Sequence, residues 1–469
     1  MKNKYQRLAG NTVKLGFGTF GSKLLVFLMV RFYTGYLTPA EYGTADLITQ
    51  TANLLLPLLS LGITDAVLRF AMDEAEDAGE VFTLGLCVIV LGCVALVPLA
   101  ALGSRVWTNG AWLIAAFIAA SNLHTLCAQF LRARGEMTLF AVQGMVNTAL
   151  VIGLNILFLA VFRLGVTGYV LSTVVADILC TVYLVIRAKL WRFLVKRPAN
   201  GTLSRMLRYC VPLIPTATFW WITSVSDRYM ITAWLGSAEN GLYAVAAKLP
   251  TILTVLSSVF MEAWLFSAVT EQTGDSKVHL QFYGAVWRTF VSGMVLSAAG
   301  VIAVSRLAVR FLAEAAYFSA WRFVPVLCLA MVFAAFSTFL SSVYVVSKKS
   351  SLSFWTALLG AGINVLLNLL LIPRIGVMGA ALATLASYVL VFLVRVVSIQ
   401  KILPFSLAVS SVILDTALLA AQAACLTLQP RGWGFVQGVC IVLLLVLNAK
   451  PLLLAAKKLF GARRKGENL

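Results

Sequence analysis

Long apolar segments follow one another along almost the whole chain, and they constrain the fold more than any other feature. A helix needs about 20 mainly apolar residues to cross the hydrocarbon layer, whereas a barrel strand needs about half as many, with alternating polarity. Hydrophobic residues make up 61% of the 469 residues, more than a water-soluble globule of this size could cover. In lipid, segments of this length satisfy their backbone groups as helices. The sequence therefore predicts an all-α, polytopic membrane protein.

We expect about fourteen transmembrane helices, arranged as two pseudo-symmetric six-helix lobes plus two C-terminal helices. The expected spans are 11–36, 43–70, 81–103, 110–131, 138–162, 166–187, 208–235, 241–268, 283–306, 322–346, 351–372, 377–398, 405–427 and 432–456. The predicted parts are an N-lobe over 1–187, a cytoplasmic linker over 188–207, a C-lobe over 208–400, and two extra helices with a basic cytoplasmic tail over 401–469.

The net charge of +19 first suggests a nucleic-acid partner, but the basic residues are not arranged for one. No basic run with interleaved aromatics and no zinc spacing is present, so we expect no nucleic acid. With both termini on one side, the large majority of loop Lys and Arg fall on that side. This bias predicts that both the N-terminus and the C-terminus are cytoplasmic. The eight cysteines lie in or beside apolar segments, and two histidines are too few for a His-based metal cluster.

The two halves of the chain resemble each other. The segment 37–43 (LTPAEYG) corresponds to 235–241 (LGSAENG), and 163–168 (RLGVTG) corresponds to 374–379 (RIGVMG). An even number of helices in each half gives the repeats the same orientation, related by an axis along the membrane normal. Two such bundles around a central cleft are typical of alternating-access transport.

Three groups of segments carry a family resemblance: 39–43, then 226–231 with 235–236 and 241–248, then 364–368 with 372–376 and 379–384. They resemble the polysaccharide flippases, which are lipid-linked oligosaccharide translocases of the multidrug/oligosaccharidyl-lipid/polysaccharide exporter superfamily. The resemblance implies two six-helix lobes facing each other, with two extra C-terminal helices. It also implies that the chain flips an undecaprenyl-pyrophosphate-linked oligosaccharide from the inner to the outer leaflet of a bacterial cytoplasmic (inner) membrane. Its partners would be this lipid-linked glycan, membrane lipids, and a polysaccharide polymerase or glycosyltransferases.

Basic residues at membrane depth are costly, by at least ~2.5–3.5 kcal/mol on insertion scales, so they usually face a wet cleft, pair with acids or reach to the interface. We predict that Lys23, Arg31, Arg228 and Lys248 line a cationic cavity that binds the pyrophosphate. Two alternatives stay open: Arg228 could pair locally with Asp227 or another acid, and Arg31 could anchor the helix at the interface.

The acids and amides at membrane depth suggest further roles. Asp227 and Glu262 are the candidates for coupling to H⁺ or Na⁺, although membrane potential alone could drive the cycle and no cofactor is needed. The acids at or near membrane depth are Asp65, Asp177, Asp227, Glu262 and Asp415, and for each of them we expect first a structural pair with a nearby Arg, such as Asp65 with Arg69. Asn364 and Asn368 could contact sugar hydroxyls or form interhelical hydrogen bonds. The candidate site therefore consists of these two asparagines together with Lys23, Arg31, Arg228, Lys248, Asp227 and Glu262.

Three other functions compete with this interpretation. A lipid II flippase would share the fold and mechanism and differ in the glycan. A multidrug cation exporter of the same superfamily would usually have twelve helices and an acid-lined cavity. A membrane enzyme would need catalytic clusters in sizeable loops, and the loops here are short, so we do not expect an enzyme.

Overall fold

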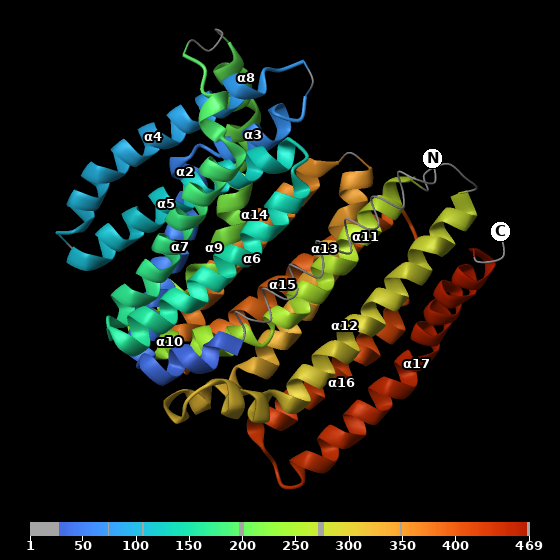
Figure 1. Cartoon of the computed structure of the whole chain (residues 1–469). Coiled ribbons are helices and arrows are strands. Elements are labelled where there is room, and N and C mark those ends of the chain that lie inside the picture. The colour runs from blue at the N-terminus through green and yellow to red at the C-terminus, as the bar shows by residue number, and fades with distance from the viewer. Residues whose placement is uncertain are drawn as a thin grey trace. The chain divides into compact units, whose positions relative to one another are not determined.

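The computed structural model describes residues 28–73, 75–105, 107–196, 201–270, 276–347 and 349–466, in which the regular structure is helical and contains no strand (Figure 1). A helix over 28–36 comes first. The following elements are α2 (Pro39–Leu59), α3 (Ile63–Phe70), α4 (Ala78–Gly103), α5 (Thr108–Ala133), α6 (Met137–Asn155), η1 (Ile156–Val161), α7 (Gly165–Ala188), η2 (Leu190–Phe193), α8 (Thr202–Cys210), η3 (Val211–Leu213), α9 (Ile214–Leu235), α10 (Ser237–Lys248), α11 (Thr251–Thr270), α12 (Ser276–Leu312), η4 (Ala315–Arg322), α13 (Val324–Val346), α14 (Ser350–Ile375), α15 (Val377–Gln400), α16 (Val409–Leu428) and α17 (Trp433–Gly466). The all-α prediction is confirmed.

Many of these helices are long and apolar enough to cross a membrane. In the described part of the chain there are 10 such helices, or up to 12 if each of two bent pairs forms one span. The first predicted span, 11–36, lies mostly outside the described residues, and α9, within the predicted span 208–235, is not among the twelve. Along α4, Val90, Leu91 and Val94 are exposed. Such a stripe suits contact with lipid rather than water.

The contacts divide the chain into two compact units, Met1–Val225 and Ser226–Leu469. The division falls inside α9, so this helix contributes residues to both units. The predicted boundaries of the lobes, the linker and the C-terminal pair remain predictions.

A bent second span occurs in each unit and agrees with the internal repeat. In unit 1, α2 and α3 differ in direction by 56°, and in unit 2 α10 and the part of α11 up to Met261 differ by 42°. Helix α2 begins with a capping box, in which the Thr38 backbone N–H donates to the Glu41 carboxylate at 2.9 Å and the Glu41 N–H donates to the Thr38 hydroxyl. Helix α10 begins at the repeat-related position, with Glu239 in its first turn.

The second repeated segment begins a helix in both units and depends on glycine there. Gly165 and Gly376, at the starts of α7 and α15, have φ values of +53° and +64°, which other residues adopt only with strain. Three residues later, Gly168 and Gly379 lie in close contact with preceding chain. A Cβ on Gly379 would lie 2.5 Å from the Leu371 carbonyl oxygen. These glycines serve helix packing, as expected for a closely packed helix pair.

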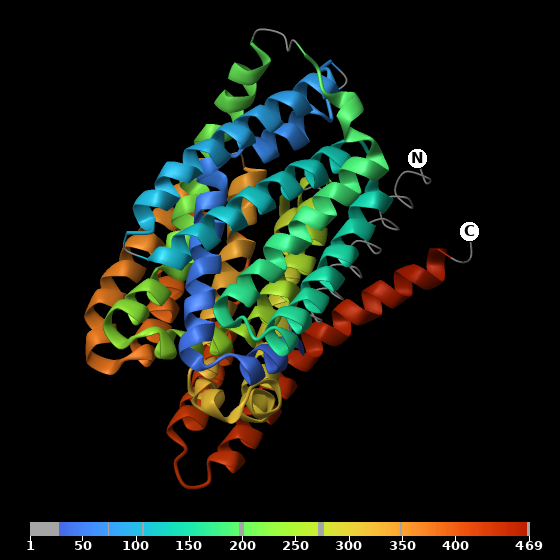
Figure 2. The same cartoon turned by 60° about the vertical axis from the view of Figure 1, so that its left-hand side comes forward.

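Unit 1 is a bundle in which α5 packs on α2, α3, α4, α6 and α7, and Figure 2 shows α4 beside α5. A core cluster that includes Ile63, Val67 and Phe130 joins α3, α5 and their neighbours. The expected pair of Asp65 with Arg69 is not the one that forms. Arg69 lies instead 4.0 Å from Asp73, four residues later, where the chain leaves α3.

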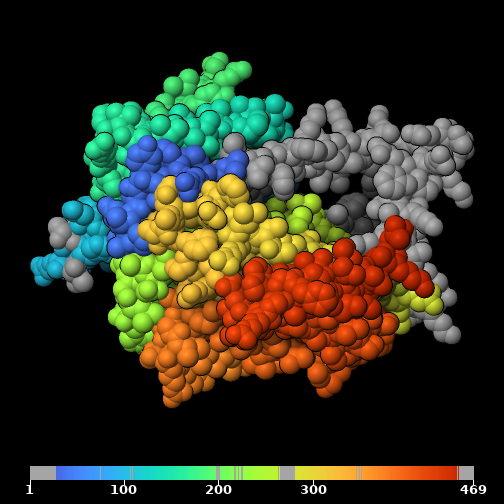
Figure 3. All heavy atoms as spheres, turned by 90° about the horizontal axis from the view of Figure 1, so that it is seen from below, coloured from blue at the N-terminus to red at the C-terminus, as the bar shows by residue number. Residues whose placement is uncertain are grey.

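Unit 2 holds its last two helices against α12 by a buried ion pair. Arg288 on α12 donates to Asp415 on α16 at 2.9 Å, and the Asn448 amide on α17 donates to the other carboxylate oxygen at 2.8 Å. The expected pairing of Asp415 with a nearby arginine is confirmed. Figure 3 shows the red residues of α17 on one face of this unit. The two extra helices are therefore packed parts of unit 2.

Candidate ion and substrate sites

The predicted cationic residues of unit 1 are only partly described. Lys23 lies outside the described residues. Arg31 lies on the helix over 28–36, where its side chain is exposed, and its carbonyl oxygen accepts a hydrogen bond from the Thr34 hydroxyl at 3.2 Å. The predicted role of both residues in a cationic cavity stays a prediction.

In unit 2, Arg228 and Lys248 are both half-buried. The guanidinium carbon of Arg228, on α9, lies 6.0 Å from the ring centroid of Tyr243, on α10, which is the outer range of a cation–π contact. Lys248 ends α10, five residues after Tyr243. Helix α10 therefore carries Lys248 itself and the Tyr243 ring that lies beside Arg228.

Asp227 is the centre of a buried polar cluster in unit 2. Only 2% of its surface is exposed. Its Oδ2 accepts a hydrogen bond from the Tyr243 hydroxyl at 2.5 Å and one from the Thr384 hydroxyl at 3.5 Å, while its Oδ1 accepts from the Arg228 backbone N–H at 2.9 Å. A single carboxylate thus joins α9, α10 and α15.

Two asparagines on α14 extend this cluster. Asn364 and Asn368 are fully buried. The side-chain oxygen of Asn364 accepts a hydrogen bond from the side-chain amide of Asn368 at 2.9 Å and one from the Ser226 hydroxyl at 3.1 Å. The side-chain amide of Asn364 donates to the Thr384 hydroxyl at 3.4 Å. The bonds of Asn364 to Ser226 and Thr384 are interhelical, whereas the bond from Asn368 lies within α14, and a glycan contact remains a prediction for both asparagines. We call Ser226, Asp227, Tyr243, Asn364, Asn368 and Thr384 the Asp227 cluster.

The remaining acids of the predicted site have different surroundings. Glu262 lies on α11, and its side chain is outside the described part of the structure. Asp177, on α7 in unit 1, is bonded to Ser121 and Asn147 and lies 3.2 Å from His124. The expected arginine partner is therefore replaced by a histidine for this acid. Among the described residues, no three His, Cys, Asp or Glu side chains are grouped as a metal site.

Sequence reasoning missed Tyr243 and Thr384, although both lie in the segments that carry the family resemblance. A signal for them was present, because each is a hydroxyl-bearing residue in an apolar helix, where an unsatisfied hydroxyl is costly. The sequence alone gave no means of pairing them with Asp227, since 157 residues separate Thr384 from that acid.

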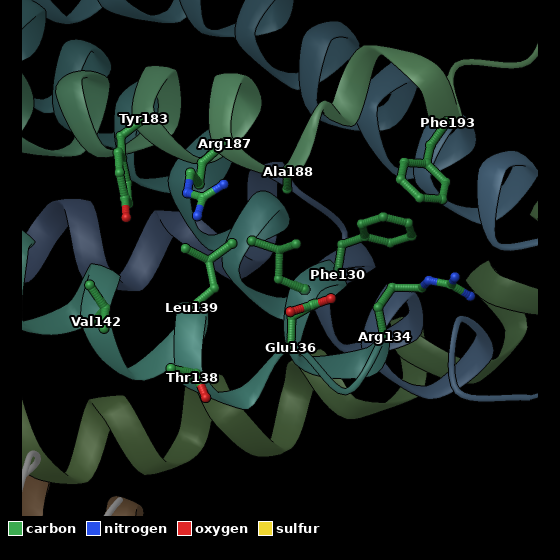
Figure 4. Close-up of a pocket in the computed structure, with 11 residues that line it drawn as sticks. Phe130, Arg134, Glu136, Thr138, Leu139, Val142, Tyr183, Arg187, Ala188 and Phe193 are labelled. Carbon is green, nitrogen blue, oxygen red and sulfur yellow. The ribbon is translucent and has the colours of Figure 1, made fainter.

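A cavity of about 580 Å³ lies at one end of unit 1. Figure 4 shows that its walls come from α5, the α5–α6 turn, α6, α7 and η2. Arg134, Glu136 and Arg187 supply its charged groups, so the lining carries a net positive charge. Arg134 is held 5.6 Å from the Phe193 ring centroid. The positive-inside bias accounts for arginines at these sequence positions, and the fold also brings Arg134 and Arg187 to the lining of one cavity.

Known proteins resemble this chain in sequence and in fold. The uncharacterized membrane protein MJ1375 of Methanocaldococcus jannaschii is 23% identical over 413 residues, which cover 81% of this chain and 95% of that protein. The lipid II flippase MurJ in an inward closed conformation has a TM-score of 0.68 at 15% identity, covering 93% of this chain and 98% of MurJ. An inward-facing multidrug resistance MATE family transporter of the MOP superfamily has a TM-score of 0.62 at 13% identity, covering 81% and 95%.

The solved structures show the fold, and the family comes from the sequence. Residues 28–322 match the family described as polysaccharide biosynthesis protein, which is more than half of the chain. The family predicted from the sequence is thereby confirmed. With its apolar helices, the chain is a multi-pass membrane protein. It belongs to the polysaccharide biosynthesis protein family.

Proposed function

We propose that this protein is a flippase that moves an undecaprenyl-pyrophosphate-linked oligosaccharide from the inner to the outer leaflet of a bacterial cytoplasmic membrane. The observation that carries the proposal is the combination of a match to the polysaccharide biosynthesis protein family over 28–322 with a fold like that of the lipid II flippase MurJ and of a multidrug resistance MATE family transporter. Alternating access would expose a wet path to each side in turn. The prenyl chain would stay in lipid while the headgroup passes.

The electrostatics suit an anionic headgroup. Arginine binds phosphate oxygens through charge-assisted, often bidentate hydrogen bonds, and lysine binds them as a point charge. Under this proposal Lys23, Arg31, Arg228 and Lys248 contact the pyrophosphate during passage. Outward movement of negative charge across a membrane that is negative inside is favourable by ~2.3 kcal/mol per charge per 100 mV. With both termini cytoplasmic, membrane potential can therefore drive the cycle.

The unit 1 cavity is our candidate for the first contact with the headgroup. The positive-inside bias assigns the α5–α6 turn and the end of α7 to the cytoplasmic side. Arg134 and Arg187 line different parts of this cavity, each with a guanidinium group that can bind phosphate oxygens, and Tyr183 also lines it (Figure 4). The substitution R134A/R187A should slow transport by about tenfold or more, since a hydrogen bond to a charged group contributes about 1.5–3 kcal/mol.

Asp227 is our candidate for coupling to a monovalent cation. The Asp227 cluster gathers a carboxylate, hydroxyls and amide oxygens away from water. Oxygen donors of this kind suit Na⁺, and a carboxylate alone can take H⁺. Glu262 remains the second candidate. D227N should abolish the dependence of transport on an imposed Na⁺ or H⁺ gradient; unchanged dependence would rule out this assignment.

The direct test uses proteoliposomes. The purified protein is reconstituted with a labelled undecaprenyl-pyrophosphate oligosaccharide, and an impermeant oxidant measures how much glycan has reached the other leaflet. We expect transfer that depends on the protein and speeds up with a potential that is negative on the side of origin. Transfer equal to that of protein-free vesicles would refute the proposal.

Matched variants connect the transfer to the cations. R31A/R228A should slow transfer, whereas R31K/R228K should retain part of it and R105A, at an exposed loop position, should leave it unchanged. Wild-type transfer by R31A/R228A at wild-type protein level would remove the cationic cavity from the proposal.

The same vesicles separate the rival functions. Faster transfer of lipid II than of the polysaccharide precursor would assign the chain to peptidoglycan synthesis, and efflux of cationic drugs without glycan transfer would assign it to multidrug export. Partner enzymes, namely a polymerase or glycosyltransferases, would act on the precursor before or after transfer. Co-purification with them tests that expectation.

A further inference from the structure

A second buried polar cluster lies in unit 1 and contains one of only two histidines of the chain. Ser121 and His124 come from α5, Gln143 and Asn147 from α6, and Asp177 from α7. The Ser121 hydroxyl donates to Asp177 Oδ2 at 2.5 Å, and the Asn147 amide donates to Oδ1 at 2.8 Å. Asp177 is only 6% exposed. We call these five residues the His124 cluster.

The contacts of His124 fix which ring nitrogen can take up a proton. Nε2 lies 2.7 Å from the side-chain oxygen of Gln143, Oε1, which can only accept a hydrogen bond, so Nε2 carries the ring hydrogen. Nδ1 lies 3.3 Å from the Asn147 amide and 3.2 Å from Asp177 Oδ1. In the neutral ring, Nδ1 accepts one Asn147 hydrogen while the other goes to the carboxylate. The free position for an added proton is therefore Nδ1.

We propose that the His124 cluster is a proton-binding site of unit 1, with His124 Nδ1 as the acceptor and Asp177 as the counter-ion. The added proton lies between Nδ1 and Asp177 Oδ1, and the Asn147 hydrogen that faced Nδ1 must turn away. The charge of the cluster changes from −1 to 0, which suits a site where an uncompensated charge is costly. Proton uptake thus exchanges an α5–α6 hydrogen bond for an α5–α7 ion pair.

The charged groups on the helices packed around α5 do not replace Asp177 in this role. Those on the elements themselves are Glu41 and Asp46 on α2, Asp65 and Arg69 on α3, Glu80 on α4, Arg132 on α5 itself, and Arg187 on α7; α6 carries none. Among the described residues, the charged group that acts on His124 is Asp177, and the one that acts on Asp177 is His124. Within the described part of the bundle, His124 and Asp177 are therefore each other's charged partner.

This site goes beyond the proposed transport of glycan, because proton binding needs no cargo. The small number of histidines makes the test direct. In protein labelled with ¹³C-histidine, the ring signals of His124 and His279 are the two that appear, and H279Q leaves that of His124 alone. We expect the His124 signal to titrate between about pH 5 and pH 8, where histidine changes charge in proteins. A signal that stays constant over this range overturns the proposal.

Two variants test the role of the carboxylate. D177N removes the counter-ion, and S121A, a milder change, removes one hydrogen bond to it while keeping its charge. Each should give a His124 titration curve displaced from the wild-type curve, with the larger displacement in D177N. Should D177N fail to fold, S121A still provides the comparison. Curves that coincide with the wild type in every folded variant would show that Asp177 does not hold the proton, and the inference fails.

Discussion

The ion pair between Arg288 and Asp415 allows a quantitative test of how the last two helices are held. The substitution R288M keeps most of the apolar volume and removes the charge. It leaves the Asp415 carboxylate, whose side chain is 1% exposed, with the 2.8 Å hydrogen bond from Asn448 but without its cation. Breaking a buried pair in this way costs about 3–5 kcal/mol of unfolding free energy.

The converse change should cost less. In D415N, Arg288 keeps a neutral hydrogen-bond acceptor, and its side chain is 19% exposed, so we expect the unfolding free energy to fall by about 1–3 kcal/mol. The double variant R288M/D415N contains no buried charge, and should be more stable than R288M. The coupling energy should therefore exceed the loss of unfolding free energy in D415N and reach about 3 kcal/mol, the upper end of the range for residues in direct contact.

The assay is reversible unfolding in mixed micelles, followed by tryptophan fluorescence at fixed detergent composition. R310M provides the matched control, because Arg310 is an exposed arginine on the same helix. The losses of unfolding free energy in R310M and D415N should add to within about 0.5 kcal/mol in the double variant. If R288M and D415N are equally additive, the pair does not hold α16 and α17 against α12, and the reasoning is refuted.

Two further changes test other parts of the fold. G379A places a methyl group 2.5 Å from the Leu371 carbonyl oxygen and should cost about 1–3 kcal/mol of unfolding free energy, whereas G362A, with open space around it, should not. The unfolding assay described above compares the two variants, and equal stability would contradict the packing. Y243F removes the hydroxyl that donates to Asp227 and should weaken ion-dependent transport by about tenfold or more at unchanged protein level. The measurement is the dependence of vesicle transfer on the Na⁺ or H⁺ gradient, and an unaltered dependence would show that Tyr243 has no part in coupling.

The helices and the repeat could be predicted from the sequence because each leaves a local signal. Apolar length predicts a span, and the paired segments at 163–168 and 374–379 predict equivalent helix starts, which the glycines at 165 and 376 confirm. Partnerships between helices leave no such signal. The Asp65–Arg69 pair was expected from spacing alone, and the nearby Asp73 competes successfully for the same arginine. His124 and Asp177 are 53 positions apart, so only the fold brings them together.

The partners of the buried acids distinguish structural roles from coupling roles. Asp415 faces an arginine, whose charge is constant at every physiological pH, so the pair stays compensated and its helices stay joined. Asp177 faces a histidine, the side chain whose charge changes in that range, together with hydroxyl and amide donors that can reorient. Under the proposed transport function, some contacts must form and break during the cycle, and a fixed ion pair opposes that requirement. The nature of the cationic partner, more than the depth of the acid, is therefore our reason for placing a proton-binding site at Asp177 and a structural role at Asp415.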